Sequence, residues 1–357
     1  MTFVYILAAV LIFGVLVAVH EFGHFITAKL CGVRVNEFSI GMGPAIWSRQ
    51  RGETLYALRA LPVGGYCAME GEDEDSGDDR ALVRQSFWKQ LLIFAAGSFM
   101  NLLAGFLIIL VLYSSASGFY TAEIVNFAPE LQQRGTDGLQ VGDELWSIDG
   151  ERVYLYSDIS LLLGLNRTGV FDLVVLRGGE KISLENVSLP RQEYTSTDGV
   201  SRYTGVGLYF GNVEPATLGG RLKNTWLNTV DFIRVVRLSL QMLLSGEAGM
   251  KDLSGPVGIV STITEVGTAS ESVGAAVENI AYFAAMLAVN LAVMNMLPIP
   301  ALDGGKILFL TLDTVFMKLF RKRIPERYEA VVNTAGFVIL MGFMLIVTFH
   351  DVFKLFQ

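Results

Sequence analysis

Four long apolar stretches place this chain in a membrane. Each approaches the roughly 20 apolar residues that a helix needs to cross about 30 Å of hydrocarbon. They run from 3 to about 31, from 91 to 113, from 282 to 297 and from 330 to 349. The composition agrees, because 52% of the 357 residues are hydrophobic and only 17% are charged. We therefore expect a mainly α-helical membrane protein with four transmembrane helices.

The positions of Lys and Arg predict how the chain crosses the membrane. Eight of these residues lie between 29 and 89, and five more lie between 318 and 327. Both segments are therefore expected on the cytoplasmic side, with both termini and the long segment 118–281 outside. The first apolar stretch lacks a basic start and a small-residue cleavage site, so we expect it to be retained.

The net charge of −8 argues against a nucleic-acid partner. Much of it comes from the run "EGEDEDSGDD" at 70–79, which we expect to be a solvated loop. Cys31 and Cys67 both fall on the predicted reducing side, so no disulfide is expected.

The chain is expected to have three parts. Residues 1–117 form an N-terminal membrane domain. In it, alternating apolar positions from Thr54 and the pair Gly64-Gly65 predict a membrane-associated β-hairpin near 53–68. Residues 118–192 form a β-rich domain, with strand-like "AEIVNF", "DELWSIDG", "FDLVVLRGG" and "KISLENVSL" around a helical "SDISLLLGLN".

The third part, 193–357, combines an interfacial helix with a second membrane domain. Between 217 and 244 polar residues recur every three to four positions and apolar ones occupy another face. This spacing predicts an amphipathic helix that lies along the membrane surface, either as an anchor or as part of a gate.

The motif "HEFGH" places ionisable side chains inside the first apolar stretch. His20 and His24 are four residues apart, so on a helix both imidazoles face one point, with Glu21 beside them. H-E-x-x-H is the spacing of zinc proteases, in which the histidines bind the ion and the glutamate takes a proton from the attacking water. A buried carboxylate without a partner is costly. The motif therefore predicts a Zn²⁺ site with Glu21 as its general base.

Asp303 is the expected third ligand. A catalytic zinc site needs three protein ligands, and His350 lies at the end of the last stretch, away from the pair. Asp303 follows Pro298 and Pro300, which break the third stretch, and irregular backbone at membrane depth lines a protein or watery cavity. Asp303 can instead cap the helix that follows it, and taken alone the two roles weigh equally.

Five motifs occur together in this order. They are HEFGH, "FSIGMGP" (38–44), "GSFMN" (97–101), "LSGPVGI" (253–259) and "NMLPIPALDGG" (295–305). In this respect the chain resembles the site-2 proteases, intramembrane zinc metalloproteases, and in particular their bacterial regulator-of-sigma-E type. The resemblance covers nearly the whole chain.

The resemblance implies zinc-dependent cleavage of transmembrane segments in pre-trimmed, single-span membrane proteins of the bacterial cytoplasmic membrane, such as anti-sigma factors or remnant signal peptides. His20, His24 and Asp303 would be the zinc ligands, and Glu21 the general base and later proton donor. It also implies that the hairpin pairs with an extended substrate. Four residues are expected at the substrate: Asn290, Asn295, Pro298 and Pro300.

The outer domain resembles a PDZ domain, most clearly in "GLQVGDELWSIDG". Such domains accept a peptide by strand addition at a sheet edge. Two roles stay open at this point: contact with a peptide or with the substrate's outer portion, or a size filter that excludes bulky outer domains.

Two other functions fit the same residues. A membrane metal transporter would use the histidines and the aspartate as a transit site, and would need further intramembrane ligands. A catalytically idle scaffold would bind membrane partners through its outer domain, and would not need Glu21.

Overall fold

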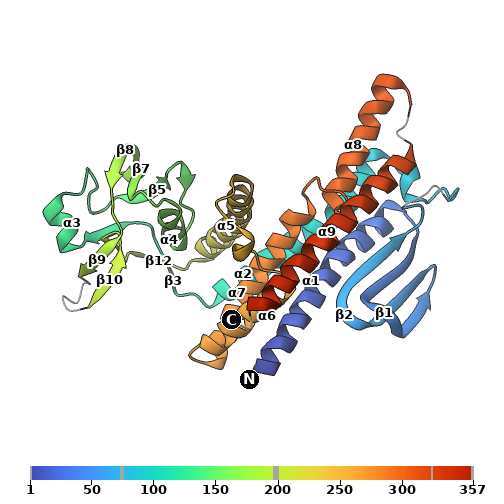
Figure 1. Cartoon of the computed structure of the whole chain (residues 1–357), viewed down its shortest axis with the longest axis horizontal. Helices are drawn as coiled ribbons and strands as arrows, with labels where there is room; N and C mark the ends of the chain where they lie inside the picture. Colours follow the sequence, from blue (N-terminus) through green and yellow to red (C-terminus); the bar gives the residue numbers. More distant parts are fainter. Residues whose placement is uncertain (1, 73–75, 196–200, 323–324, 355–357) are drawn as a thin grey trace. The chain divides into compact units, whose positions relative to one another are not determined.

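The computed structural model describes residues 2–72, 76–195, 201–322 and 325–354. The chain forms two compact units, one made of residues 1–109 and 232–357, and the other of residues 110–231 (Figure 1). The boundaries between the units fall within two long helices, α2 (Phe87–Ser114) and α5 (Leu218–Ser245).

Four helices in the described residues are long and apolar enough to cross a membrane, which confirms the four predicted spans. They are α1 (Thr2–Cys31), α2 (Phe87–Ser114), α7 (Val273–Asn295) and α9 (Glu326–Lys354). The predicted start of α7 at 282 is wrong. Ser272 caps the helix by accepting a hydrogen bond from the Ala275 amide at 3.1 Å. The hydropathy of the first turns is lowered by the polar residues Glu278 and Asn279, so the apolar stretch appeared to begin later than the helix does.

Three further helices in the described residues are at least 14 residues long. They are α5 (Leu218–Ser245), α6 (Pro256–Ala269) and α8 (Asp303–Phe320). The amphipathic helix predicted at 217–244 corresponds to α5. Asp351, near the end of α9, is only 4% exposed and accepts hydrogen bonds at 2.8 Å from the amides of Gly255 and Gly258. This carboxylate therefore satisfies the free amides at the start of α6.

The predicted hairpin is part of a larger sheet. Strands β1 (Val35–Arg51) and β2 (Thr54–Met69) pair antiparallel around a turn at Gly52 and Glu53, so Gly64-Gly65 lies inside β2 and is not the turn. The boundaries 53–68 are therefore too narrow. The short hairpin pattern missed β1 because its second half is exposed throughout, and such a strand has no buried face to mark it.

The acidic run at 70–79 is not a free loop where the structure describes it. Glu70 binds Asn36 at 2.8 Å and Glu72 binds Lys306 of α8 at 2.5 Å. Residues 73–75 lie outside the described residues. Two acidic side chains of the run are thus bound by an amide and a cation from distant segments. The local sequence does not show these partners.

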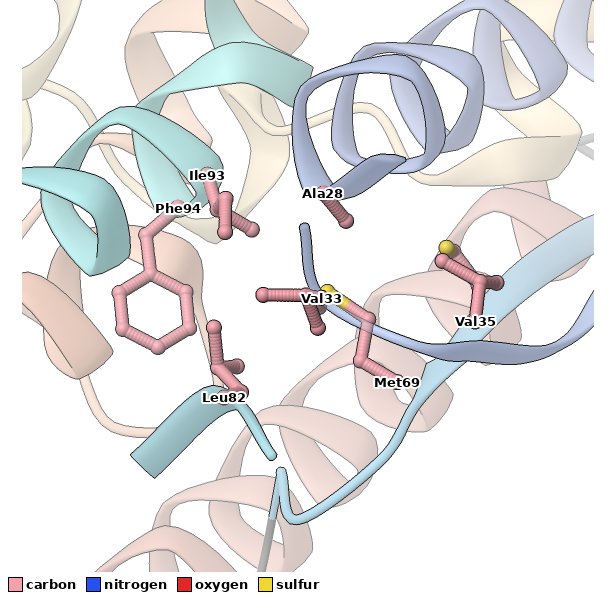
Figure 2. Close-up of a cluster of buried hydrophobic side chains, with 8 residues drawn as sticks. Ala28, Val33, Val35, Met69, Leu82, Ile93 and Phe94 are labelled. Atoms are coloured by element: carbon pink, nitrogen blue, oxygen red, sulfur yellow. The ribbon is translucent and has the colours of Figure 1, made fainter. Parts of the chain in front are cut away.

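A hydrophobic cluster joins one end of the sheet, where β1 begins and β2 ends, to α1 and α2 (Figure 2). Ala28 comes from α1, Leu82 from the 3₁₀ turn η1 (Leu82–Arg84), and Ile93 and Phe94 from α2. Val33, Val35, Cys67 and Met69 complete it. Cys31 and Cys67 are free thiols. The cluster fixes α1 against α2 beside the histidine pair.

The second unit is built mainly of strands. All the strands and the helix read from the sequence in this region are confirmed, as β4, β5, β7, β8 and α4. The elements are β3 (Gly118–Tyr120), β4 (Ile124–Phe127), α3 (Pro129–Arg134), β5 (Glu144–Ile148), β6 (Glu151–Arg152), α4 (Tyr156–Leu165), β7 (Val170–Arg177), β8 (Glu180–Ser188), β9 (Gln192–Thr195), β10 (Arg202–Gly205), β11 (Leu208–Phe210) and β12 (Val213–Pro215).

The main sheet of this unit has the order β6-β5-β7-β8. In the "VGDEL" segment the carboxylate of Asp143 is fully buried, and the Arg177 guanidinium binds it through two hydrogen bonds of 2.7 and 2.8 Å. Strands β11 and β12 return to pair with β4 and β3. These strands follow residue 192. The boundaries 118–192 and the PDZ-like assignment stay predictions.

Candidate metal centre

His20 and His24 lie one turn apart on α1 and face the same point. Their Nε2 atoms are 3.2 Å apart, and the residues are only 9% and 6% exposed. The rest of α1 is apolar around its whole circumference, so its hydropathy does not show which face is turned inward. Only the spacing of the two histidines identifies that face.

The backbone of α2 fixes the orientation of one ring. His24 Nδ1 donates a hydrogen bond to the carbonyl oxygen of Ile93 at 2.8 Å. An imidazole that donates from Nδ1 keeps the lone pair on Nε2, which is the arrangement of a metal-ligating histidine. Ile93 itself is held by the cluster of Figure 2.

Asp303 reaches the histidine pair from the other end of the chain. Its Oδ2 lies 3.1 Å from His20 Nε2 and 3.3 Å from His24 Nε2. Leu302 is the N-cap residue of α8, and no side chain caps that helix. Of the two roles that the sequence left open for Asp303, the structure therefore excludes the cap.

Three glycines make this approach possible, and none of them had a predicted role. A Cβ on Gly97 would lie 2.4 Å from His24 Nε2. A Cβ on Gly304 or Gly305 would lie 2.3 Å from backbone oxygens of the loop between α7 and α8. The sequence feature that could have pointed to these glycines is their presence in the motifs "GSFMN" and "NMLPIPALDGG". They show that close packing brings the three donors together.

Glu21 is half-buried beside the pair. On a helix it lies about 60° around the axis from His24. A Cβ on Gly65 of β2 would lie 3.5 Å from Glu21 Cγ, so the sheet passes directly by the predicted base.

The structure separates the two asparagines predicted at the substrate. Asn295, the last residue of α7, has its Nδ2 3.5 Å from His20 Nε2. Asn290 lies five residues earlier, about 140° around the same helix. Asn295 therefore stands beside the histidine pair, and the role of Asn290 stays a prediction.

The two prolines lie in the loop between α7 and α8. Pro298 is exposed. Pro300 packs on α9, where a Cβ on Gly336 would come within 2.4 Å of its own Cβ. The amide of Ala301 donates to Asn333 Oδ1 of α9 at 3.3 Å. This loop is thus held in place by α9.

The donor set fits a zinc ion. Within the described residues, His20, His24 and Asp303 form a group whose ligand atoms all lie within 4.8 Å of one another. Two imidazole nitrogens and one carboxylate oxygen match the His₂-carboxylate sets of catalytic zinc sites, which keep a position open for water. A cation also satisfies three buried acceptor atoms that face one point.

Comparisons with known proteins agree with this geometry. The model of peptidase family M50 matches residues 8–343. A protein of Clostridium perfringens whose name describes it as a zinc metalloprotease is 36% identical, over 98% of each chain. The regulator of sigma-W protease RasP of Bacillus subtilis is 27% identical over 98% of this chain and 99% of its own. The zinc metalloprotease RasP of Shouchella clausii is 28% identical over 99% of each.

The matched region includes α2 and α7 completely, most of α1 and α9, and all three donor residues. The chain therefore belongs to peptidase family M50, the site-2 proteases, and is a multi-pass membrane protein and a zinc metalloprotease.

Proposed function

We propose that this protein is an intramembrane zinc endopeptidase in which His20, His24 and Asp303 hold the ion. The observation that carries the proposal is the convergence of their donor atoms, two from a helix long and apolar enough to span a membrane and one from the start of α8. A bound zinc ion supplies Lewis-acid chemistry, because it polarises the scissile carbonyl and makes water a stronger nucleophile at neutral pH.

Glu21 is proposed as the general base. Its place one residue after His20 puts the carboxylate beside the donor atoms, on the side where Gly65 of β2 passes. Glu21 takes a proton from the attacking water and then gives it to the leaving nitrogen. Asn295, with its amide beside His20, is suited to bind the carbonyl oxygen as negative charge develops on it.

The proposed substrate is the transmembrane segment of a single-span membrane protein that has already been trimmed on its outer side. A helical peptide bond has its amide and carbonyl already bonded, so the segment unwinds before it is cut. The β1–β2 sheet passes by Glu21, and strand addition at its edge would replace the lost hydrogen bonds. Anti-sigma factors and remnant signal peptides are substrates of this kind.

The proposed location is the bacterial cytoplasmic membrane, with both termini and the second unit outside. The Lys and Arg residues at 29–89 and 318–327 support this orientation. The exposed apolar residues of the four long helices are then covered by membrane lipid.

The two other functions are less well supported. Among the described residues, the cluster at His20 is the one group of three metal-binding side chains, whereas a transporter needs further sites along its path. An idle scaffold has no use for a base beside the donor atoms.

Purified protein, a single-span substrate and a zinc chelator test the proposal. Glu21→Gln keeps the ligands and removes the base, so it should retain zinc and lose cleavage by roughly 10²–10⁴-fold. Asp303→Asn should lower zinc occupancy. Continued turnover by Glu21→Gln would refute the assigned base, and full zinc occupancy in Asp303→Asn would place the third ligand elsewhere.

A further inference from the structure

The two histidines are held differently. His24 Nδ1 donates to the Ile93 carbonyl oxygen at 2.8 Å. His20 Nδ1 is just as buried, yet it has no hydrogen-bond partner among the described residues. A ligating histidine almost always donates its second ring N–H to an acceptor, which fixes the ring and raises its basicity. If His20 ligates a metal through Nε2, its Nδ1–H is therefore expected to donate a hydrogen bond to an acceptor.

The same interface contains a second unpaired polar atom. Asn101 of α2 is 1% exposed, and its Oδ1 has no hydrogen-bond partner among the described residues. An unpaired buried polar atom costs roughly 1–3 kcal/mol. Two such atoms, one a donor and one an acceptor, satisfy each other if they meet.

The geometry of α2 brings Asn101 toward His20. Gly97 faces the histidines, since a Cβ there would lie 2.8 Å from His20 Nδ1. Asn101 is four residues further on and shares this face, about 40° around the axis. A helical side chain leans toward the N-terminus, over the preceding turn. The amide of Asn101 thus leans over Gly97, where the ring of His20 lies.

We propose that Asn101 is a positioning residue of the metal centre: its side-chain oxygen accepts the Nδ1–H of His20, directly or through one buried water, and so presents Nε2 as the ligand atom. This inference rests on the proposed metal centre. It gives the asparagine of "GSFMN" a role equivalent to that of the Ile93 carbonyl at His24.

The neighbouring Ser98 offers a matched control. Its Oγ is also buried and without a partner among the described residues. It lies about 100° from Gly97 around the helix, on the far side of Asn101. Ser98→Ala should therefore leave zinc binding unchanged.

The test is zinc affinity, measured by competition with a chromophoric chelator, together with the visible spectrum of the Co²⁺-substituted protein. Asn101→Leu should weaken zinc binding by roughly 10–100-fold and alter the Co²⁺ bands, because His20 loses its fixed orientation. A merely structural role predicts a different result. In that case the metal-free variant would unfold at a lower temperature, whereas the zinc affinity and the Co²⁺ bands of the folded protein would stay unchanged.

Each outcome has one meaning. Affinity within twofold of the unaltered protein in Asn101→Leu, or a loss in Ser98→Ala instead, would overturn the role of Asn101. His20→Ala serves as the reference for the centre itself. If His20→Ala binds zinc as well as the unaltered protein does, the proposed metal centre fails, independently of the result for Asn101.

Discussion

Gly97 has no Cβ, and this allows α2 to pack directly against the two histidine rings of the metal centre. A Cβ there would lie 2.4 Å from His24 Nε2 and 2.6 Å from His20 Cε1. Gly97→Ala must therefore push α2 away or turn the rings. A displacement of about 1 Å at a catalytic group costs on the order of 100-fold in rate.

We expect Gly97→Ala to lose zinc on dialysis and to cleave about 100-fold more slowly, as measured by elemental analysis and a cleavage assay. Gly342→Ala is the matched control, since it is also a glycine in a long apolar helix and a Cβ there meets nothing within 4 Å. Normal zinc content in Gly97→Ala would show that the helices adjust without moving the donors.

The sequence predicted the histidine pair and Glu21 because their spacing on one helix is a local property. It offered Asp303 two roles, ligand or cap, and the structure adds what the sequence could not show, short distances to two residues about 280 positions away. The contacts of Gly97 and Ile93 with the histidines were not predictable, since each depends on which face of α2 meets α1.

At the scale of elements, Glu53 joins the β1–β2 turn to its surroundings. Its carboxylate binds Lys29 and Arg80 at 2.7 Å each. The hydrogen bonds from these two cations lower the pKa of Glu53 below its usual value of 4.5. Since the pKa is lower in the folded state, the stabilisation is complete above pH 4.5 and is lost as the pH falls through the folded value.

Hydrogen exchange of the turn amides should show this dependence. We expect protection at residues 52–55 to be constant between pH 7 and 6 and to fall about twofold on further acidification, the size expected for a largely solvent-screened ion pair. Glu53→Gln should show the lower protection already at pH 7. Equal protection of the unaltered turn at pH 7 and in acid would contradict this assignment.

Element prediction succeeded where a pattern is continuous and failed where partners are distant. The apolar length of α1 and the polar spacing of α5 are visible in the chain itself. The second half of β1 is exposed and without a buried face. Strands β11 and β12 are short and pair with β4 and β3, about 90 residues earlier in the chain. A local pattern does not predict them, because their partners are distant.

At the scale of the whole molecule, a membrane protease with a separate unit of 110–231 must choose among many membrane proteins. A size filter and a peptide-docking site make different demands on the substrate. A filter responds to the bulk of the outer portion and not to its sequence. A docking site responds to a specific peptide and is open to competition.

A size filter predicts that a single-span substrate without its outer portion is cut at least about tenfold faster than the full-length form, a difference of about 1.4 kcal/mol. Replacing the outer portion by an unrelated folded domain of equal size should keep the slow rate, since bulk alone decides it. A short peptide matching the trimmed end should not compete. Equal rates for the full-length and trimmed substrates would eliminate the filter, whereas inhibition by the added peptide would assign the second unit to docking.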